Sequence, residues 1–353
     1  MKNYMKENSI YEDCSEDSYE ESSEDSCNTC DEEKCKNLLL PKVTKHYINS
    51  NVQYISDDWV NSVTLNPWGI VALEEKPCCP ANVYWVANNG SRKLCKYFRS
   101  GQLYEQAEVN DHLPTGLVYN YTDFYGQYKL ITVTLDGTIE GLKVDINNKA
   151  ATSTEVIKER IDKELYTGVD LNKDNLYVCD FYNGNIEMYD NNFNFIKNFD
   201  KDDALFQSGY CPYNVIIDCG YVYVAFAKKS DVGCGIPSIG FGYIDKFSLD
   251  GELLYRFVSR DPLNAPWGLA FSECGKYLYV GNTGDGKINI FDKCSQEFIG
   301  PIMDKNCNPV QIGNLWGLAS NLNRLIFTSG IDGSPENCGD SANGLIGYLR
   351  LID

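Results

Sequence analysis

Hydrophobic and polar positions in residues 60–353 follow one pattern six times: a Gly-centred apolar stretch, then an aromatic and aliphatic run about ten residues later. The six starts read NPWGIVAL, LPTGLVYN, LYTGVDLN, CPYNVIID, APWGLAFS and NLWGLASN. Their central positions are spaced by 47, 52, 46, 54 and 49 residues and are Gly69, Gly116, Gly168, Asn214, Gly268 and Gly317. A period of this length is typical of propeller blades. We therefore expect an all-β fold, a six-bladed β-propeller.

Each predicted blade has four short strands separated by tight turns. The sixth blade is the exception, because its third strand, LIGYLRLI, is the last strand of the sequence. The spare strand is HYINSNVQYI, and we expect residues between about His46 and Ile55 to pair beside Leu345–Ile352, which closes the ring without an open edge. The one helix that the pattern predicts is short and lies around Thr154–Glu164.

The chain divides into two regions. Residues 1–39 contain 12 acidic residues and 4 lysines, and their apolar content is too small to offset the entropy cost of ordering. This predicts a disordered, acidic, Cys-containing tail at residues 1–39, followed by a single propeller domain at residues 46–353.

Charge and hydropathy exclude some partners. The formal net charge is −19, or −11 without the tail, which disfavours nucleic acid because affinity for phosphates depends on Lys and Arg. No stretch approaches 18 apolar residues, so membrane insertion is not expected. The start MKNYMKENSIYEDC lacks the apolar core of a signal peptide, which predicts cytoplasmic synthesis.

Fifteen cysteines are many for a reducing cytosol. Three explanations stay open: reduced structural cysteines, a metal cluster, or oxidation after assembly into a particle such as a virion. The last fits the richness in Asn, Lys, Ile and Tyr, which suggests an AT-rich coding genome of the kind found in some protists and large DNA viruses.

Two disulfides are candidates, because each pair of cysteines lies in connections at one face of one blade. They are Cys307 with Cys338 and Cys274 with Cys294. The tail has too few apolar residues to form the nucleus of a zinc site, so we assign its cysteines to anchoring, by intermolecular disulfides or as an address tag. They are Cys14, Cys27, Cys30 and Cys35.

Several motifs occur in a fixed order between about Tyr47 and Leu349: NPWGI, DGTIEG, LYVCDFYNGNIEMYD, PLNAPWGLAF, GDGKINIFD, LWGL and LIGYL. In these motifs the chain resembles an uncharacterised family of six-bladed propellers that is related to the NHL-repeat group. The resemblance implies the fold; the family has no established activity.

Three tryptophans, Trp68, Trp267 and Trp316, each precede the Gly that begins an inner strand, and Tyr213 with Asn214 is the equivalent in the fourth blade. On one interpretation these rings surround the mouth of the central channel and bind a sugar or another flat ligand. On the other they wedge between neighbouring blades.

A lactonase-like propeller would hold a metal over the channel with Glu, Asn and Asp side chains. Here the corresponding position, one residue before the central Gly, holds Trp in three blades and Thr115 or Thr167 in two others. Asn214 is the one amide near this position. Neither histidine, His46 or His112, lies in a repeat position. The acidic and amide residues between Asp170 and Asp174 are interpreted as a turn. We therefore predict no catalytic residue, metal or cofactor.

The leading hypothesis is a non-enzymatic structural or binding module. Its long connections, 200–211, 228–242 and 331–344, should gather on one face and bind protein partners or glycans there, while the tail attaches it to a virion or a surface layer. The alternatives are a metal-dependent, lactonase-like hydrolase and a soluble carbohydrate-binding propeller.

Overall fold

The computed structural model describes most of the propeller region. The described residues are 49–54, 64–73, 83–98, 101–145, 149–159, 164–201, 206–231, 234–304, 306–321, 324–330 and 343–350, with only the backbone for 49–54. The predicted tail, residues 1–39, lies outside them.

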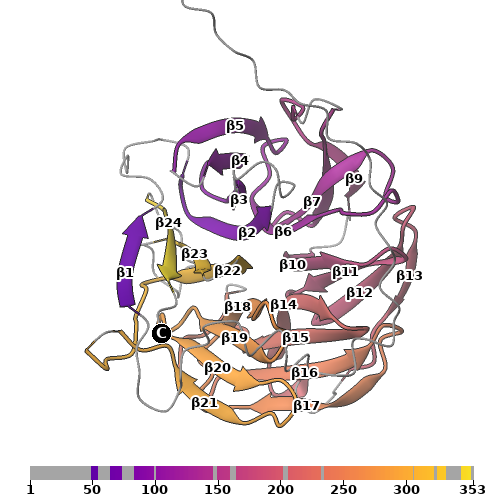
Figure 1. Cartoon of the computed structure of the whole chain (residues 1–353). Coiled ribbons are helices and arrows are strands. Elements are labelled where there is room, and N and C mark those ends of the chain that lie inside the picture. Colours follow the sequence, from indigo (N-terminus) through magenta and orange to yellow (C-terminus); the bar gives the residue numbers. More distant parts are fainter. Residues whose placement is uncertain are drawn as a thin grey trace, which may run out of the picture.

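Six antiparallel sheets of four strands surround a common axis in sequence order, as the predicted six-bladed β-propeller requires (Figure 1). Blades one to three are β2 Pro67–Leu73, β3 Val83–Asn88, β4 Lys93–Phe98 and β5 Leu103–Glu108; β6 Pro114–Tyr119, β7 Tyr128–Thr134, β8 Thr138–Lys143 and β9 Glu155–Glu159; β10 Tyr166–Leu171, β11 Asn175–Asp180, β12 Asn185–Asp190 and β13 Phe195–Asn198. Blades four to six are β14 Tyr210–Asp218, β15 Tyr221–Lys228, β16 Gly242–Ser248 and β17 Leu253–Ser259; β18 Pro266–Phe271, β19 Tyr277–Asn282, β20 Ile288–Asp292 and β21 Phe298–Pro301; β22 Leu315–Asn321, β23 Arg324–Ser329 and β24 Leu345–Arg350, with β1 Asn49–Tyr54 as the fourth strand.

The N-terminal strand closes the ring, as predicted. Strand β1 pairs antiparallel with β24, with Gln53 opposite Tyr348 and Tyr54 opposite Gly347. The sixth blade therefore combines three strands from the end of the sequence with one from its beginning (Figure 1). This pairing removes the open edge that β24 would otherwise expose.

We expect the closing strand to be needed for stability. A truncation that removes residues 1–39 keeps β1 and should melt within a few degrees of the full chain. A truncation that removes residues 1–58 deletes β1, exposes the backbone of β24 and should lower the melting temperature and promote aggregation. Calorimetry and light scattering of the two truncated proteins test this; equal melting temperatures would contradict it.

Apolar side chains between neighbouring blades form the core. Tyr279 of blade five packs with Leu318 and Phe327 of blade six, and Tyr177 of blade three packs with Val224 of blade four. All five are buried. Each blade thus buries its two apolar faces against its neighbours rather than within itself.

The Gly near the start of five of the six inner strands is required by close approach between blades. A Cβ built on Gly268 would lie 2.4 Å from the backbone oxygen of Trp316, and one on Gly317 would lie 2.4 Å from that of Trp68. Gly69, Gly116 and Gly168 face the next blade in the same way. The repeat seen in the sequence is therefore a ring of backbone contacts around the channel.

The predicted helix at Thr154–Glu164 is wrong. Residues Glu155–Glu159 form β9, the outer strand of blade two, which pairs with β8. One of its residues, Glu155, is bound by Lys143 and by the Tyr128 hydroxyl. Pairing with β8 overrides the helix preference of Glu and Lys in this segment.

Candidate functional site

Aromatic side chains seal one end of the channel. The rings of Trp68 and Trp316 stack with centroids 3.7 Å apart, and Trp267 meets both edge to face at 5.7 and 5.9 Å. Tyr213 packs against Trp316 at 6.3 Å, and Phe181 packs against Tyr213 at 4.4 Å. We call these five residues the Trp plug.

The Trp plug is buried, which favours the packing interpretation. The three tryptophans and Tyr213 are at most 2% exposed, so their rings offer no accessible face to a ligand in this structure. Burial also raises the pKa of the Tyr213 hydroxyl. The sequence found these residues because they share a repeat position, but the repeat does not show whether they line an opening or close it.

Asn214, the remaining channel candidate, bridges two blades. Its amide nitrogen donates to the backbone oxygen of Trp267 at 2.8 Å, and its Oδ1 accepts the Val215 N–H at 2.9 Å. It occupies the position that holds Gly in the other blades, and it also lines the deep part of the channel. Its contacts assign it a structural role in the ring.

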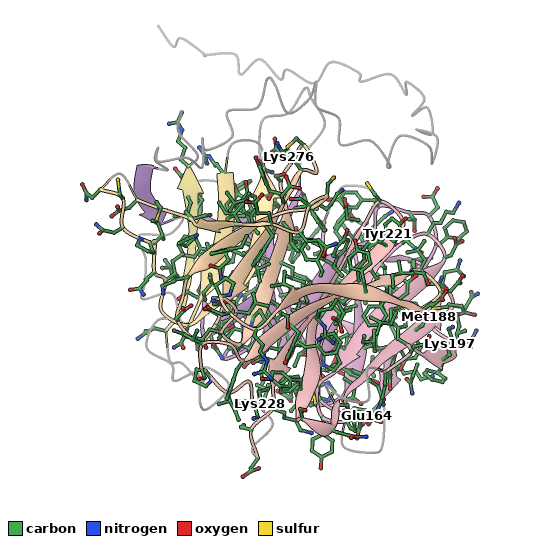
Figure 2. All side chains as sticks on the ribbon, turned by 90° about the horizontal axis from the view of Figure 1, so that it is seen from below. Glu164, Met188, Lys197, Tyr221, Lys228 and Lys276 are labelled. Carbon is green, nitrogen blue, oxygen red and sulfur yellow. The ribbon has the colours of Figure 1, made fainter. Side chains whose placement is uncertain are left out.

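The opposite end of the channel is hollow. A cavity of about 370 Å³ lies between the last residues of the six inner strands, and a deeper hollow of about 150 Å³ continues towards the Trp plug. Figure 2 shows the two faces of the disc, with Lys228 and Glu164 on the plug face and Lys276 on the other, which we call the open face.

One carboxyl group lines this cavity. Asp170 lies two residues after Gly168, the central position of its repeat. The equivalent residues in the other blades are Val71, Val118, Ile216, Ala270 and Ala319. All six of these residues line the cavity. An acid therefore replaces the apolar residue in one blade out of six. The residue pattern around Asp170 predicts a turn and gives no sign of its place in the cavity.

Asp170 is held by backbone groups. Its Oδ2 accepts the N–H of Ile217 at 2.7 Å and its Oδ1 accepts that of Leu171 at 2.8 Å. Burial raises the pKa of this carboxyl from 3.8 to about 7, and the two hydrogen bonds offset part of the effect. Asn172, the next acceptor of the motif, binds the N–H groups of Asp174 and Asn175, so the predicted turn is present.

A second buried carboxylate also escaped the sequence analysis. Glu140 on β8 is fully buried, and its Oε1 lies 2.5 Å from His112 Nδ1 and 3.0 Å from the Thr138 hydroxyl. Its Oε2 accepts hydrogen bonds from Asn110 at 2.8 Å and from Thr154 at 2.5 Å. Four partners occupy the acceptor sites of this carboxylate. It therefore links neighbouring segments by hydrogen bonds and is not available as a general base.

Other third strands carry a buried polar residue at the same position. Glu187 accepts hydrogen bonds from the Tyr166 and Tyr189 hydroxyls, and Asp245 binds Arg256. No short motif marks these acids. The sequence feature that could have identified them is a polar residue within an otherwise apolar strand, at the same position of several repeats. Among the described residues, no three His, Cys, Asp or Glu side chains lie together as a metal site.

The two predicted disulfides are absent, because Cys274, Cys294 and Cys307 are reduced in the structure. Cys274 and Cys294 lie in turns two strand spacings apart, roughly 10 Å, which is beyond the Cα separation of a disulfide. Cys307 belongs to a local turn in which its N–H binds the Asp304 oxygen at 3.0 Å. Its proposed partner, Cys338, lies outside the described residues, as do the four tail cysteines.

Among the described cysteines, Cys234, in the connection between β15 and β16, is disulfide-bonded, and the other seven are thiols.

The plug face carries exposed aromatic side chains between blades three and four. Tyr182 is 42% and Phe206 40% exposed. Lys229 Nζ lies 4.9 Å from the Tyr182 ring centre, and Lys201 Nζ lies 4.3 Å from that of Phe206. Tyr182 follows β11, and Phe206 lies in one of the predicted long connections, between β13 and β14. We call these four residues the aromatic–lysine patch.

These features define the class: a six-bladed β-propeller with a channel plugged at one end and hollow at the other. The chain belongs to the same family as proteins of Acanthamoeba polyphaga mimivirus. It is 31% identical over 318 residues to the uncharacterised protein R648, which covers 81% of this chain and 74% of the relative. For the uncharacterised protein L690 the identity is 30% over 318 residues, with coverage of 81% and 80%. A third mimivirus protein, the uncharacterised R640, is 34% identical over 175 residues, 46% of this chain and 32% of the relative.

No family model matches the chain, so the relation to NHL-repeat propellers stays a prediction. Within the described residues, no helix has the length and hydropathy needed to cross a membrane.

Proposed function

We propose that this chain is a non-enzymatic propeller that acts as a rigid binding module in a larger particle such as a virion, with a protein partner on the plug face. The observation that carries the proposal is the aromatic–lysine patch. Exposed aromatic rings are enriched at protein interfaces, and here two of them lie on the face where long connections emerge.

Three further observations support this function. The Trp plug closes the channel at this face, which leaves a surface rather than a deep pocket for a partner. The relatives in the family are viral proteins. The disulfide at Cys234 fits a final location that is oxidising, and the tail at residues 1–39 would supply the attachment.

The test measures whether the chain copurifies with virus particles from its natural source. We expect the wild-type protein to copurify with particles and the amount of a Tyr182→Ser/Phe206→Ser variant to fall by about thirtyfold, since the loss of two interface anchors at about 1 kcal/mol each lowers the affinity by that factor. Phe298→Ser is the matched control, because Phe298 is 41% exposed on the outer strand β21. Melting curves of the purified proteins show that both variants are folded.

Particles that lack the protein, or that retain the double variant at the level of the control, would contradict the proposal. Turnover of lactones or esters together with a bound metal would support the hydrolase instead. Binding on a glycan array that the double variant loses would support the carbohydrate-binding propeller.

A further inference from the structure

The cavity on the open face is mostly aliphatic, with the polar side chains of Thr122, Asn172 and Ser320 and one carboxyl group among its described lining residues. Its wall consists largely of aliphatic residues such as Ile70, Val118 and Leu269 from different blades, and among the described lining residues Asp170 alone is acidic or basic. Burial of a carboxylate in an apolar wall costs free energy unless it is paired. In the other five blades an apolar residue fills this position without that cost.

The structural role of Asp170 does not require a charge. Its hydrogen bond to Ile217 links blades three and four, but an amide or hydroxyl oxygen would accept the same bond. None of the equivalent residues, which are Val or Ile or Ala, makes such a bond with its side chain. The presence of an ionisable acid at this position is therefore the feature that needs an explanation.

Each oxygen of Asp170 accepts one hydrogen bond in the structure, which leaves one further acceptor site on each. A cation with at least two N–H donors can use both free acceptor sites, and the aliphatic wall beside them favours one that is carried on an alkyl chain; an alkyl ammonium, with three donors, meets both conditions. We propose that the open-face cavity binds an aliphatic ammonium, with its nitrogen at Asp170 and its chain along the apolar wall.

Aromatic rings at the mouth suit the same chemistry. Tyr119 and Tyr121 form an edge-to-face pair with centroids 4.8 Å apart, and Phe271 lines the same cavity from blade five. Tyr121 is 73% exposed, so it stands at the solvent side. Ring faces attract a cation, which would favour an ammonium over a neutral ligand of equal length on its way to Asp170.

The pH dependence of binding follows from the groups around the carboxyl. The titratable groups that face it are Tyr119 and Tyr121 in the cavity wall and Tyr125 behind Asn172. Burial raises the pKa of Tyr119 and of Tyr125, so both hydroxyls are neutral below pH 9. Affinity for an ammonium should therefore rise with pH as Asp170 ionises around pH 7.

The site is independent of the proposed partner surface, which lies on the plug face. Two sources share the ligand chemistry, a free amine and a lysine side chain of another protein. Hexylamine and N-acetyl-lysine methylamide are the probes for the two sources, and hexanol is the neutral control of matched length.

The experiment is a titration of the full chain by calorimetry at pH 8 in 0.15 M salt, followed by pH 6. We expect hexylamine to bind wild type about tenfold more tightly than hexanol, since a hydrogen bond to a charged group contributes more than 1 kcal/mol. Asp170→Asn should lose this preference and keep hexanol binding. The control is Asp123→Asn, which removes the same charge from an exposed position near Tyr121, and it should bind hexylamine like wild type.

Tighter binding of the lysine derivative than of hexylamine would assign the site to a protein side chain, within the proposal. Equal binding of hexylamine and hexanol to wild type would overturn the proposal. An equal loss of hexylamine affinity in Asp170→Asn and Asp123→Asn would also overturn it, because that result means attraction to the net charge alone.

Thermal stability gives a second readout. Because the folded pKa of Asp170 is above the unfolded value, its contribution to stability falls as pH rises from about 4 to 7, and Asp170→Asn should show a smaller fall.

Discussion

Replacement of Trp316 by alanine should reduce the free energy of unfolding by about 3–5 kcal/mol, the range for truncation of a large buried aromatic residue. Trp316 is fully buried and stacks on Trp68, and it also meets Trp267 and Tyr213 edge to face. It therefore joins side chains of blades one, four, five and six at the axis. Urea denaturation followed by circular dichroism measures the loss.

Trp316→Phe is the matched control. The indole N–H of Trp316 has no hydrogen-bond partner among the described residues, so the smaller ring loses packing but no hydrogen bond. We expect a loss of less than about 1.5 kcal/mol for this variant. A loss below 1 kcal/mol for Trp316→Ala would mean that the plug is not a structural element and would reopen the ligand interpretation of the tryptophans.

Replacement of Gly268 by alanine should cost about 3 kcal/mol or prevent folding. The new Cβ would lie 2.4 Å from the Trp316 oxygen and 2.9 Å from the Leu318 Cγ, and the ring of blades leaves the backbone little room to move. Gly268 is not among the glycines with positive φ, so without this contact alanine would stabilise by about 0.4–1 kcal/mol. The sign of the change in unfolding free energy therefore shows which effect dominates: destabilisation indicates the steric contact, and stabilisation indicates the loss of backbone entropy in the unfolded chain.

Asn214→Ala tests the same ring at a position that already carries a side chain. It removes the hydrogen bond to the Trp267 oxygen and should cost about 1 kcal/mol, which leaves a folded protein for comparison if Gly268→Ala does not fold. Thermal and urea denaturation of the two variants give the comparison. A stabilised Gly268→Ala protein would show that the blades can separate at this point.

Blade number, strand order and ring closure could be predicted because they depend on local patterns. The Gly-centred starts recur at blade spacing, and the sixth blade lacks one strand that only the segment around Asn49–Tyr54 could supply. The error at Thr154–Glu164 has a physical cause: an outer strand is half exposed, so its residues carry the charge pattern of a helix. The prediction of the Cys274–Cys294 disulfide was wrong because two turns on the same side of one blade can be two strand spacings apart.

The spacing of motifs along the chain is enough to identify equivalent positions: six inner-strand starts, three tryptophans before Gly, and a closing strand. What those positions do depends on how the six blades pack around the axis. Side chains that are about fifty residues apart meet only when the ring closes, so the sealing of one end of the channel by Trp68, Trp267 and Trp316 could not be inferred from spacing. For the same reason the sequence pattern indicated only a turn at Asp170, and its place among five apolar equivalents around the axis makes it an acid in a mostly aliphatic cavity wall.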